Sequence, residues 1–377
     1  MNWFIIVFFC ICICLGFIYD KSKILPIVIM GIFFIITCFS YDGNDFLNYS
    51  RMYNHVGNGG VVNYEILFVT LMKFFNFLGL TYEQFRMIIT FMELLLIYST
   101  IRKYVKHSSF MWALFLIYPG WLLTTLLRHS LSLAVMVFSV RFIVAEKNKK
   151  NLLGLLGCIV TASLIHSSYW VFLTLLLVKL FEPEKILKIA IISVSIVGVL
   201  VLVLGDIAPI VRLISVLPIR TRLIDKYFNG YHQNIVGIIY SCFRQFLLIS
   251  YGCIPVFFYH KKIQNKKIEE NTTKYLMDNI IKINYCSLFV LCESFFASNS
   301  SRLNQVIFVI NLIAWAVCIN EYPFYGLRYV IKEKMILKII ALFIPILFSV
   351  LQCTLESRVV FDNVLKMIFE TNTVLRW

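Results

Sequence analysis

The chain has 377 residues, of which 60% are hydrophobic and 15% are charged, and its formal net charge is +15. A mean hydropathy of +0.83 excludes an ordinary soluble domain, because apolar stretches of about 17–20 residues recur along the whole length. The positive charge does not indicate nucleic-acid binding, since the basic residues stand in short loops between these stretches. We therefore expect an all-α polytopic integral membrane protein.

The expected membrane spans follow one another with short polar turns between them. In chain order they cover residues 3–19, 24–40, 84–101, 109–127, 129–145, 186–205, 236–258, 279–296, 304–319 and 335–353. The apolar tract 152–181 is too long for one span, so we split it at His166 into two short helices. With the apolar piece 66–80, this predicts about 11–13 transmembrane helices around an extracytoplasmic active-site cavity.

We expect one polytopic domain over residues 1–377, in which the spans are joined by polar loops and followed by an amphipathic tail. The main outer loops are 41–63, whose glycines permit tight turns, and 206–234. The tail 354–377 is expected to lie on a membrane surface. Whether 64–80 crosses the membrane or only dips into it decides which side holds the 41–63 loop, and the sequence leaves this open.

Lysine and arginine in the loops set the expected orientation. The lysine-rich turns 146–151 and 259–282 are expected on the cytoplasmic side. The basic residues of the inner loops are almost all lysine, whereas those of the outer segments are mostly arginine: Arg51, Arg128, Arg212, Arg220, Arg222, Arg302, Arg358 and Arg376. Topology requires only positive charge inside, and arginine is the better bidentate partner for phosphate. The outer face therefore indicates a lipid-linked diphosphate as ligand, although Arg358 and Arg376 are more simply explained by lipid headgroups.

The stretch 122–172 is the expected nucleus of an active site. Two apolar spans surround a lysine turn, and the ends away from that turn carry Arg128 and His129 on one span and His166, Ser167 and Ser168 on the other. Because the two spans are similar in length, Arg128 and His166 should lie at the same membrane depth. Ionisable residues at this depth are costly unless they serve a site. The alternative is that His166 and the two serines cap two short helices.

Short motifs follow one another in a characteristic order. The 41–63 loop carries the pattern Tyr-Asp-x-x-Asp-x-x-x-Tyr-x-x-x-Tyr, formed by Tyr41, Asp42, Asp45, Tyr49 and Tyr53. An acid-led apolar segment begins with Tyr64 and Glu65. Further along, Arg128 to Leu131 opens a span, and a Leu-Ile-His-Ser-Ser motif ends at Ser168.

In the order and spacing of these motifs the chain resembles the EpsG-type branch of the Wzy-like polysaccharide polymerases. The resemblance covers residues 41–185, and in the later half it comprises the span pattern and Ser301-Arg302 at the opening of a span. The family usually has Gly-x-Arg-Gln-x-x-Ala, whereas Leu126, His129 and Ser132 stand at its glycine, glutamine and alanine positions.

The resemblance implies a polymerase of surface polysaccharide in a bacterial cytoplasmic membrane. Such an enzyme transfers a glycan from undecaprenyl diphosphate to a sugar hydroxyl of another lipid-linked repeat unit. The diphosphate leaving group needs positive charge, for which Arg128 is the first candidate. The acceptor hydroxyl must lose a proton to a base within reach, and His166 is preferred over Asp45, for which a turn role near Gly43 is the alternative.

The expected substrate-binding residues are Arg51, Tyr49, Tyr53, His129, Arg220, Arg222, Arg244 and Arg302. The two tyrosines are one helical turn apart and suit either sugar stacking or interfacial anchoring. No cofactor and no metal are expected, because no CxxC pair has a metal partner and arginine can replace a divalent cation at a diphosphate. The expected partners are the undecaprenyl-diphosphate-linked oligosaccharide and membrane lipid, with a chain-length regulator as a further candidate and no nucleic acid.

Two other functions compete with the polymerase. A flippase or transporter of the same lipid-linked oligosaccharide would call for repeated halves and charges along a path through the midplane, and the sequence shows no such repeat. An O-antigen ligase would use the same donor and therefore the same chemistry.

Overall fold

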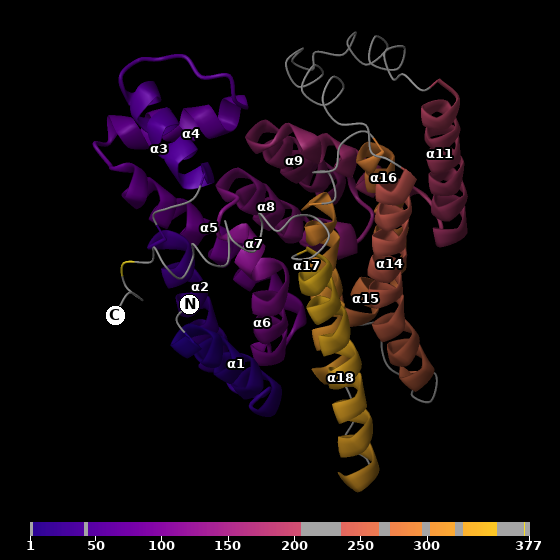
Figure 1. Ribbon diagram of the computed structural model, residues 1–377. Coiled ribbons are helices and arrows are strands. Elements are labelled where there is room, and N and C mark those ends of the chain that lie inside the picture. Colours follow the sequence, from indigo (N-terminus) through magenta and orange to yellow (C-terminus); the bar gives the residue numbers. More distant parts are fainter. Residues whose placement is uncertain are drawn as a thin grey trace. The chain divides into compact units, whose positions relative to one another are not determined.

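The computed structural model describes residues 3–40, 44–204, 235–263, 272–295, 302–320, 327–352 and 373. All the secondary-structure elements in these ranges are helices (Figure 1). Four of them are long and apolar enough to cross a membrane, within Tyr82–Tyr104, Leu127–Val144, Gly237–Lys261 and Glu333–Leu351, and shorter apolar helices accompany them. The prediction of an all-α polytopic membrane protein is confirmed, whereas the number of spans stays a prediction.

The helices form two compact units, and the expectation of a single domain stays a prediction. The first unit comprises Met1–Phe142, Leu153–Trp170 and Val309–Trp377, and the second comprises Ile143–Leu152 and Val171–Phe308. The helices that begin in the first unit are α1 (Trp3–Ile18), α2 (Leu25–Cys38), α3 (Asn44–Gly57), α4 (Ile66–Phe77), α5 (Tyr82–Tyr104), α6 (Ser109–Phe115), η1 (Leu116–Gly120), α7 (Trp121–Leu123), α8 (Leu127–Val144), η2 (Ser167–Leu176) and α18 (Leu327–Leu351). Those that begin in the second are α9 (Lys149–Ile165), α10 (Leu177–Leu180), α11 (Pro183–Leu204), α14 (Ile235–Ile263), α15 (Thr272–Cys286), α16 (Leu288–Ser294) and α17 (Asn304–Asn320).

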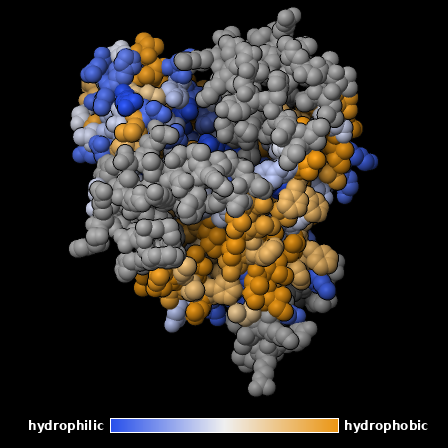
Figure 2. Space-filling view, viewed as in Figure 1, coloured by the Kyte–Doolittle hydropathy of each residue, from blue (hydrophilic) through white to orange (hydrophobic). Residues whose placement is uncertain are grey.

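The polar loop expected at 41–63 contains a helix, α3. Tyr49, Tyr53 and Val56 recur at helical spacing on its buried side, and they pack against α4 and α5 in a core with Phe68 and Phe85. The opposite side is polar, and hydrophilic residues gather over α3 in the space-filling view, whereas hydrophobic residues cover α18 (Figure 2). This helix was not predicted, because its amphipathic spacing lies among glycines and asparagines, and the assignment of 41–63 as an outer loop stays a prediction.

Helix α4 is short for a transmembrane helix, and whether 64–80 dips into the membrane or crosses it stays a prediction. It has 12 residues, a length of roughly 18 Å, whereas the apolar core of a bilayer is about 30 Å thick. A turn at Gly79, which has a φ of +75°, joins α4 to α5. The start of α5 is fixed by a capping box between Thr81 and Gln84.

The single span expected at 109–127 is broken into α6, η1 and α7. Tyr118 has extended backbone angles, and Pro119 follows it inside η1. Proline disfavours the helical conformation of the residue before it and has no N–H to donate. Helix α18 bonds to both sides of the break, because Ser349 Oγ donates to the Ile117 carbonyl at 2.5 Å and accepts from Trp121 Nε1 at 3.3 Å.

A buried ion cluster joins α18 to the turn between α1 and α2. The Asp20 carboxylate lies 2.5 Å from Lys334 Nζ and 3.0 Å from Lys338 Nζ. Lys338 also donates to the Phe17 carbonyl at 2.7 Å, near the end of α1 where a cation is favourable. Burial raises the pKa of Asp20, but the two lysines lower it by more, so the pKa lies below its ordinary value.

Helices α8 and α9 form the predicted hairpin, and α9 ends at Ile165 as expected. Ser132 Oγ donates to the Ala162 carbonyl at 3.0 Å and fixes the register of the two helices. Nearer the lysine turn, Gly154 lies so close to the Phe142 ring that an added Cβ would come within 2.6 Å of it. The register brings the first turn of α8 to the end of α9.

The second unit contains a buried polar group between its helices. Gln245 of α14 donates to the Ser287 hydroxyl and accepts from Asn304 of α17 at 2.9 Å. Next to it, Tyr251 and Phe308 stack with ring centroids 5.0 Å apart. Because polar side chains inside a membrane bundle need partners, these contacts hold α14 to its neighbours.

Candidate active site

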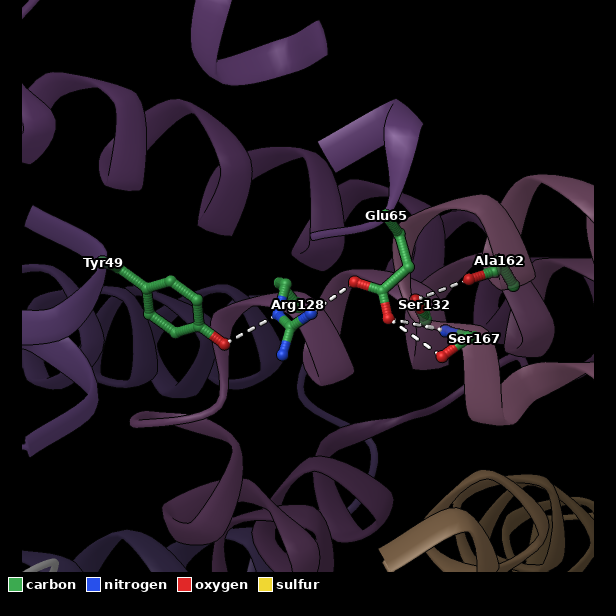
Figure 3. A network of polar contacts seen from close by, with 6 residues as sticks. All are labelled: Tyr49, Glu65, Arg128, Ser132, Ala162 and Ser167. Carbon is green, nitrogen blue, oxygen red and sulfur yellow. Dashed lines mark hydrogen bonds and ion pairs between the residues drawn. The ribbon is translucent and has the colours of Figure 1, made fainter. Parts of the chain in front are cut away.

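Arg128 stands in the first turn of α8, with its side chain only 16% exposed. Its Nε donates to the Tyr49 hydroxyl at 2.9 Å, and its Nη1 forms an ion pair with Glu65 Oε2. Figure 3 shows the guanidinium between these two partners, while its third nitrogen carries no dashed line. Among the described residues, Nη2 therefore has no hydrogen-bond partner, and the guanidinium keeps a donor for a ligand.

Aromatic rings surround the guanidinium of Arg128. Its Cζ lies 4.2 Å from the centroid of the Tyr64 ring, 5.7 Å from that of Tyr49 and 6.0 Å from that of Phe68. Such cation–π contacts stabilise the charge in a poorly hydrated place. Burial raises the pKa of the Tyr49 phenol, so at neutral pH the phenol is uncharged and can accept from Arg128.

Glu65 joins Arg128 to the end of α9. Its Oε1 accepts from both the backbone N–H and the hydroxyl of Ser167, each at 3.0 Å (Figure 3). Glu65 is also the N-cap residue of α4, yet its side chain makes no capping hydrogen bond there. The carboxylate is therefore not tied to its own helix and bonds across the fold to Arg128 and Ser167.

Two further contacts position this group. The Ser132–Ala162 bond lies four residues from Arg128 along α8 and four residues from His166 along α9. The buried guanidinium of Arg86 on α5 donates to the Ser40 carbonyl at 2.6 Å and to the Thr124 carbonyl at 3.1 Å. Because Thr124 belongs to the turn that leads into α8, Arg86 holds the start of the helix that carries Arg128.

His166 belongs to a cluster of three rings. Its ring centroid lies 6.0 Å from that of His129 and 5.7 Å from that of Tyr169. The Tyr169 hydroxyl is 3.0 Å from His129 Nδ1 and donates to the His129 carbonyl at 3.0 Å. The structure thus places Arg128 and the 166–168 corner together, as the hairpin predicted. His129 is 5% exposed and contacts rings of the protein.

A second buried carboxylate lies in the same unit. Glu93 of α5 is 3% exposed and accepts from the Ser130 hydroxyl at 2.7 Å. Ser130 follows Arg128 by two residues, so the first turn of α8 bonds to a carboxylate on each of two sides.

The other candidates on α3 take different positions. Asp45 is half-buried in the first turn of the helix, close enough for its charge to act on the Tyr49 phenol and raise its pKa. Arg51 is exposed. Tyr53 is 1% exposed, and its hydroxyl donates to the Leu80 carbonyl at 2.8 Å. Tyr53 therefore packs in the core, and its position does not favour stacking on a sugar.

Two of the remaining arginine candidates lie in the second unit, and two lie outside the described residues. Arg244 of α14 is 3% exposed, with its guanidinium 5.6 Å from the Tyr240 ring centroid, and Arg302 lies just before α17; both belong to the second unit. Arg220 and Arg222 lie outside the described residues, as do the 206–234 loop and, except for Thr373, the 354–377 tail. Within the described part of the chain, no three His, Cys, Asp or Glu residues form a group that could hold a metal ion.

The sequence interpretation assigned no role to Glu65, Tyr64, Ser167 or Tyr169 individually. The signal for Glu65 was its place at the head of an apolar segment, where an acid usually indicates a helix start. The signal for Ser167 was stronger, because a polar break inside an apolar tract has to satisfy its own backbone. Only the folded hairpin shows that Ser167 bonds to Glu65 and that Glu65 pairs with Arg128.

The fold and this site define a class of protein. It is a polytopic helical membrane protein in which a partly exposed arginine, a carboxylate, hydroxyls and a histidine meet at the end of a helix hairpin. Such a group can bind an anion and move protons.

A family model described as the EpsG family matches residues 22–360, and the chain belongs to that family. Membership suggests a polysaccharide polymerase-like role, that is, a glycosyltransferase-like activity in a membrane protein. No curated protein matches the chain. No solved structure matches it either.

Proposed function

We propose that the protein polymerises a surface polysaccharide by transferring a glycan from undecaprenyl diphosphate to a sugar hydroxyl of another lipid-linked repeat unit. The observation that carries this proposal is the environment of Arg128, a cation with one uncommitted donor at a helix end in a membrane protein of the EpsG family. A diphosphate is an anion that a guanidinium binds well. The lysine-rich turn between α8 and α9 is expected on the cytoplasmic side, so the site at the opposite ends of these helices is assigned to the extracytoplasmic side of a bacterial cytoplasmic membrane.

The reaction is a single displacement. The acceptor oxygen forms a bond to the anomeric carbon of the donor glycan while the bond from that carbon to the diphosphate oxygen breaks. Attack from the side opposite the diphosphate inverts the anomeric configuration. Arg128 stabilises the negative charge that develops on the departing undecaprenyl diphosphate.

His166 is the proposed acceptor of the hydroxyl proton. An imidazole is the side chain that most often serves as a general base, and His166 precedes Ser167, which bonds to the same Glu65 that pairs with Arg128. Asp45 is the second candidate, because its charge acts on Tyr49, which bonds to Arg128. His166→Gln should therefore reduce elongation more than Asp45→Asn does.

The test uses the purified full-length protein in liposomes with a lipid-linked repeat unit. The wild type should form longer lipid-linked chains, and Arg128→Ala should lower the rate by a factor of roughly a hundred to a thousand. Arg141 is a matched control, since it lies on the same helix and its guanidinium rests against the Phe138 ring at 4.7 Å. Arg141→Ala should keep the wild-type rate. A normal rate for Arg128→Ala would contradict the assignment of this site.

A deletion strain separates the polymerase from a flippase of the same lipid. Loss of a polymerase leaves single lipid-linked repeat units on the outer side of the membrane, whereas loss of a flippase leaves them on the inner side. Detection of the units on the inner side alone would contradict the proposal.

A further inference from the structure

The carboxylate of Glu65 occupies a receptor for an anion. Three groups donate to it: the Arg128 guanidinium, the Ser167 N–H and the Ser167 hydroxyl. A cation near a helix N-terminus is not favoured by the helix itself, whereas an anion is. Arg128 therefore stands where an anionic partner is needed, and in the structure that partner comes from the protein.

We propose that Glu65 holds the place of the donor's diphosphate, which displaces the carboxylate from Arg128 as it binds. This inference rests on the proposed function, because it adds a regulatory contact to the same site. The displaced carboxylate keeps its two bonds to Ser167, so it stays beside the bound diphosphate. It returns to Arg128 when the undecaprenyl diphosphate product leaves.

A permanent structural ion pair is the simpler interpretation, and three observations argue against it. First, the side chains of Arg128 and Glu65 are 16% and 14% exposed, so a ligand can reach both. Second, Nη2 of Arg128 has no partner in the described part of the chain, and a diphosphate oxygen can bind it before the Glu65 contact breaks. Third, Glu65 is the N-cap residue of α4 but makes no side-chain capping bond there, so its carboxylate is not tied to its own helix.

The displacement has a consequence for turnover. Undecaprenyl diphosphate is both the anion held during the reaction and the product that must leave, and release of product often limits a membrane enzyme's rate. A carboxylate that competes for the same guanidinium weakens the binding of both the donor and this product. Removal of the carboxylate charge should therefore tighten binding and slow repeated turnover, while the first transfer proceeds.

The experiment measures binding of undecaprenyl diphosphate to the full-length protein in nanodiscs, together with elongation in liposomes. Glu65→Gln keeps an oxygen that can accept from Ser167 but removes the charge, and it should bind the lipid about tenfold more tightly than the wild type. Its first round of transfer should match the wild type, and later rounds should be slower. Glu83→Gln is the matched control, because Glu83 stands in the first turn of α5, and it should leave the affinity unchanged.

Glu65→Asp guards against a failure of the glutamine variant to fold. It keeps the charge but is one methylene shorter, so it should pair less well with Arg128 and also tighten binding, to a smaller extent. Unchanged or weaker binding in both variants would overturn the displacement, even if the wild type elongates. Tighter binding in the variants, with no elongation by any of the proteins, would instead support the displacement and contradict the polymerase.

Discussion

Two ion clusters in the first unit hold their cations in different ways. At Asp20, two lysines share one carboxylate, and the more buried lysine also bonds to a carbonyl at the end of α1. At Arg128, one guanidinium is shared by a carboxylate and a phenol and retains a nitrogen without a partner among the described residues. The comparison shows that a buried charge in this protein can either stabilise the packing of helices or remain available to a ligand. The two lysines bind a carboxylate of the protein and hold helices together, whereas the Arg128 guanidinium keeps one nitrogen available for a ligand.

The largest expected effect falls on the lysine cluster. Asp20→Asn leaves Lys334 and Lys338 without their carboxylate and should lower the free energy of unfolding by about 3 kcal/mol at neutral pH. Affinity for undecaprenyl diphosphate should stay at the wild-type value. Urea unfolding in detergent, followed by tryptophan fluorescence, measures the first quantity. Loss of lipid affinity with unchanged stability would erase the distinction between the two clusters.

The difference in stability between the wild type and Asp20→Asn should depend on pH. The pKa of Asp20 is lowered in the folded protein, because the two lysines outweigh the effect of burial. The stabilisation is therefore complete above the unfolded-state pKa of about 3.9 and is lost as the pH falls through the lower folded-state pKa. The stability difference between wild type and Asp20→Asn should be constant down to about pH 5 and should shrink below pH 4. A difference that widens on acidification would contradict this.

Arg128→Lys tests whether the planar guanidinium, rather than its positive charge alone, is required. Lysine keeps the positive charge but cannot bond to Tyr49, Glu65 and a ligand in one plane. Elongation should fall about a hundredfold, which corresponds to about 2.7 kcal/mol in the barrier, while the thermal unfolding temperature stays within a few degrees of the wild type. Arg141→Lys on the same helix is the control. Full elongation by Arg128→Lys would show that charge alone suffices.

A smaller effect is expected at the hairpin. Ser132→Ala removes the bond to the Ala162 carbonyl and leaves that buried carbonyl without this donor. The free energy of unfolding should fall by about 1 kcal/mol, and elongation should fall with it because the register of α8 and α9 loosens. Ser139→Ala is the control, because Ser139 bonds within its own helix to the Met136 carbonyl. Equal effects of the two variants would exclude a special role for the hairpin bond.

The smallest effects separate the two tyrosines of α3. Tyr49→Phe removes the acceptor of Arg128 Nε and should lower elongation by up to about tenfold with little change in stability. Tyr53→Phe removes the bond to the Leu80 carbonyl and should lower stability by about 1 kcal/mol with elongation unchanged. Paired assays of elongation and thermal unfolding distinguish them. The reverse pattern would show that the core tyrosine is the one that serves the site.

Much of the fold was predictable because the spans are long and apolar. The ends of α8 and α9 were predictable too, since a lysine turn and two polar breaks bracket them symmetrically. Helix α3 was not, because its amphipathic spacing is short and its residues favour turns. The break at Pro119 was not predicted for a different reason. The stretch is apolar on both sides of the proline, so its hydropathy indicates one continuous span.

The candidate site was predictable only in part. An arginine at a helix boundary and a histidine between serines are visible as exceptions in apolar sequence. Glu65 is not such an exception, because an acid ahead of an apolar segment is ordinary at a helix start. Its pairing with Arg128 joins residues 63 positions apart in sequence, and no local pattern encodes that. Tyr49 and Tyr53 look equivalent in sequence and differ only in what their hydroxyls meet.

The bond between Ser132 and the Ala162 carbonyl fixes how far α9 is displaced along α8. A slip of α9 along α8 by one turn would shift the Ser167 end by about 5.4 Å, more than the reach of any hydrogen bond. Such a slip would separate Ser167 from Glu65 while leaving Tyr49 in place beside Arg128. Anything that pulls on the lysine turn, at the far end of both helices, would thus alter the receptor without entering it.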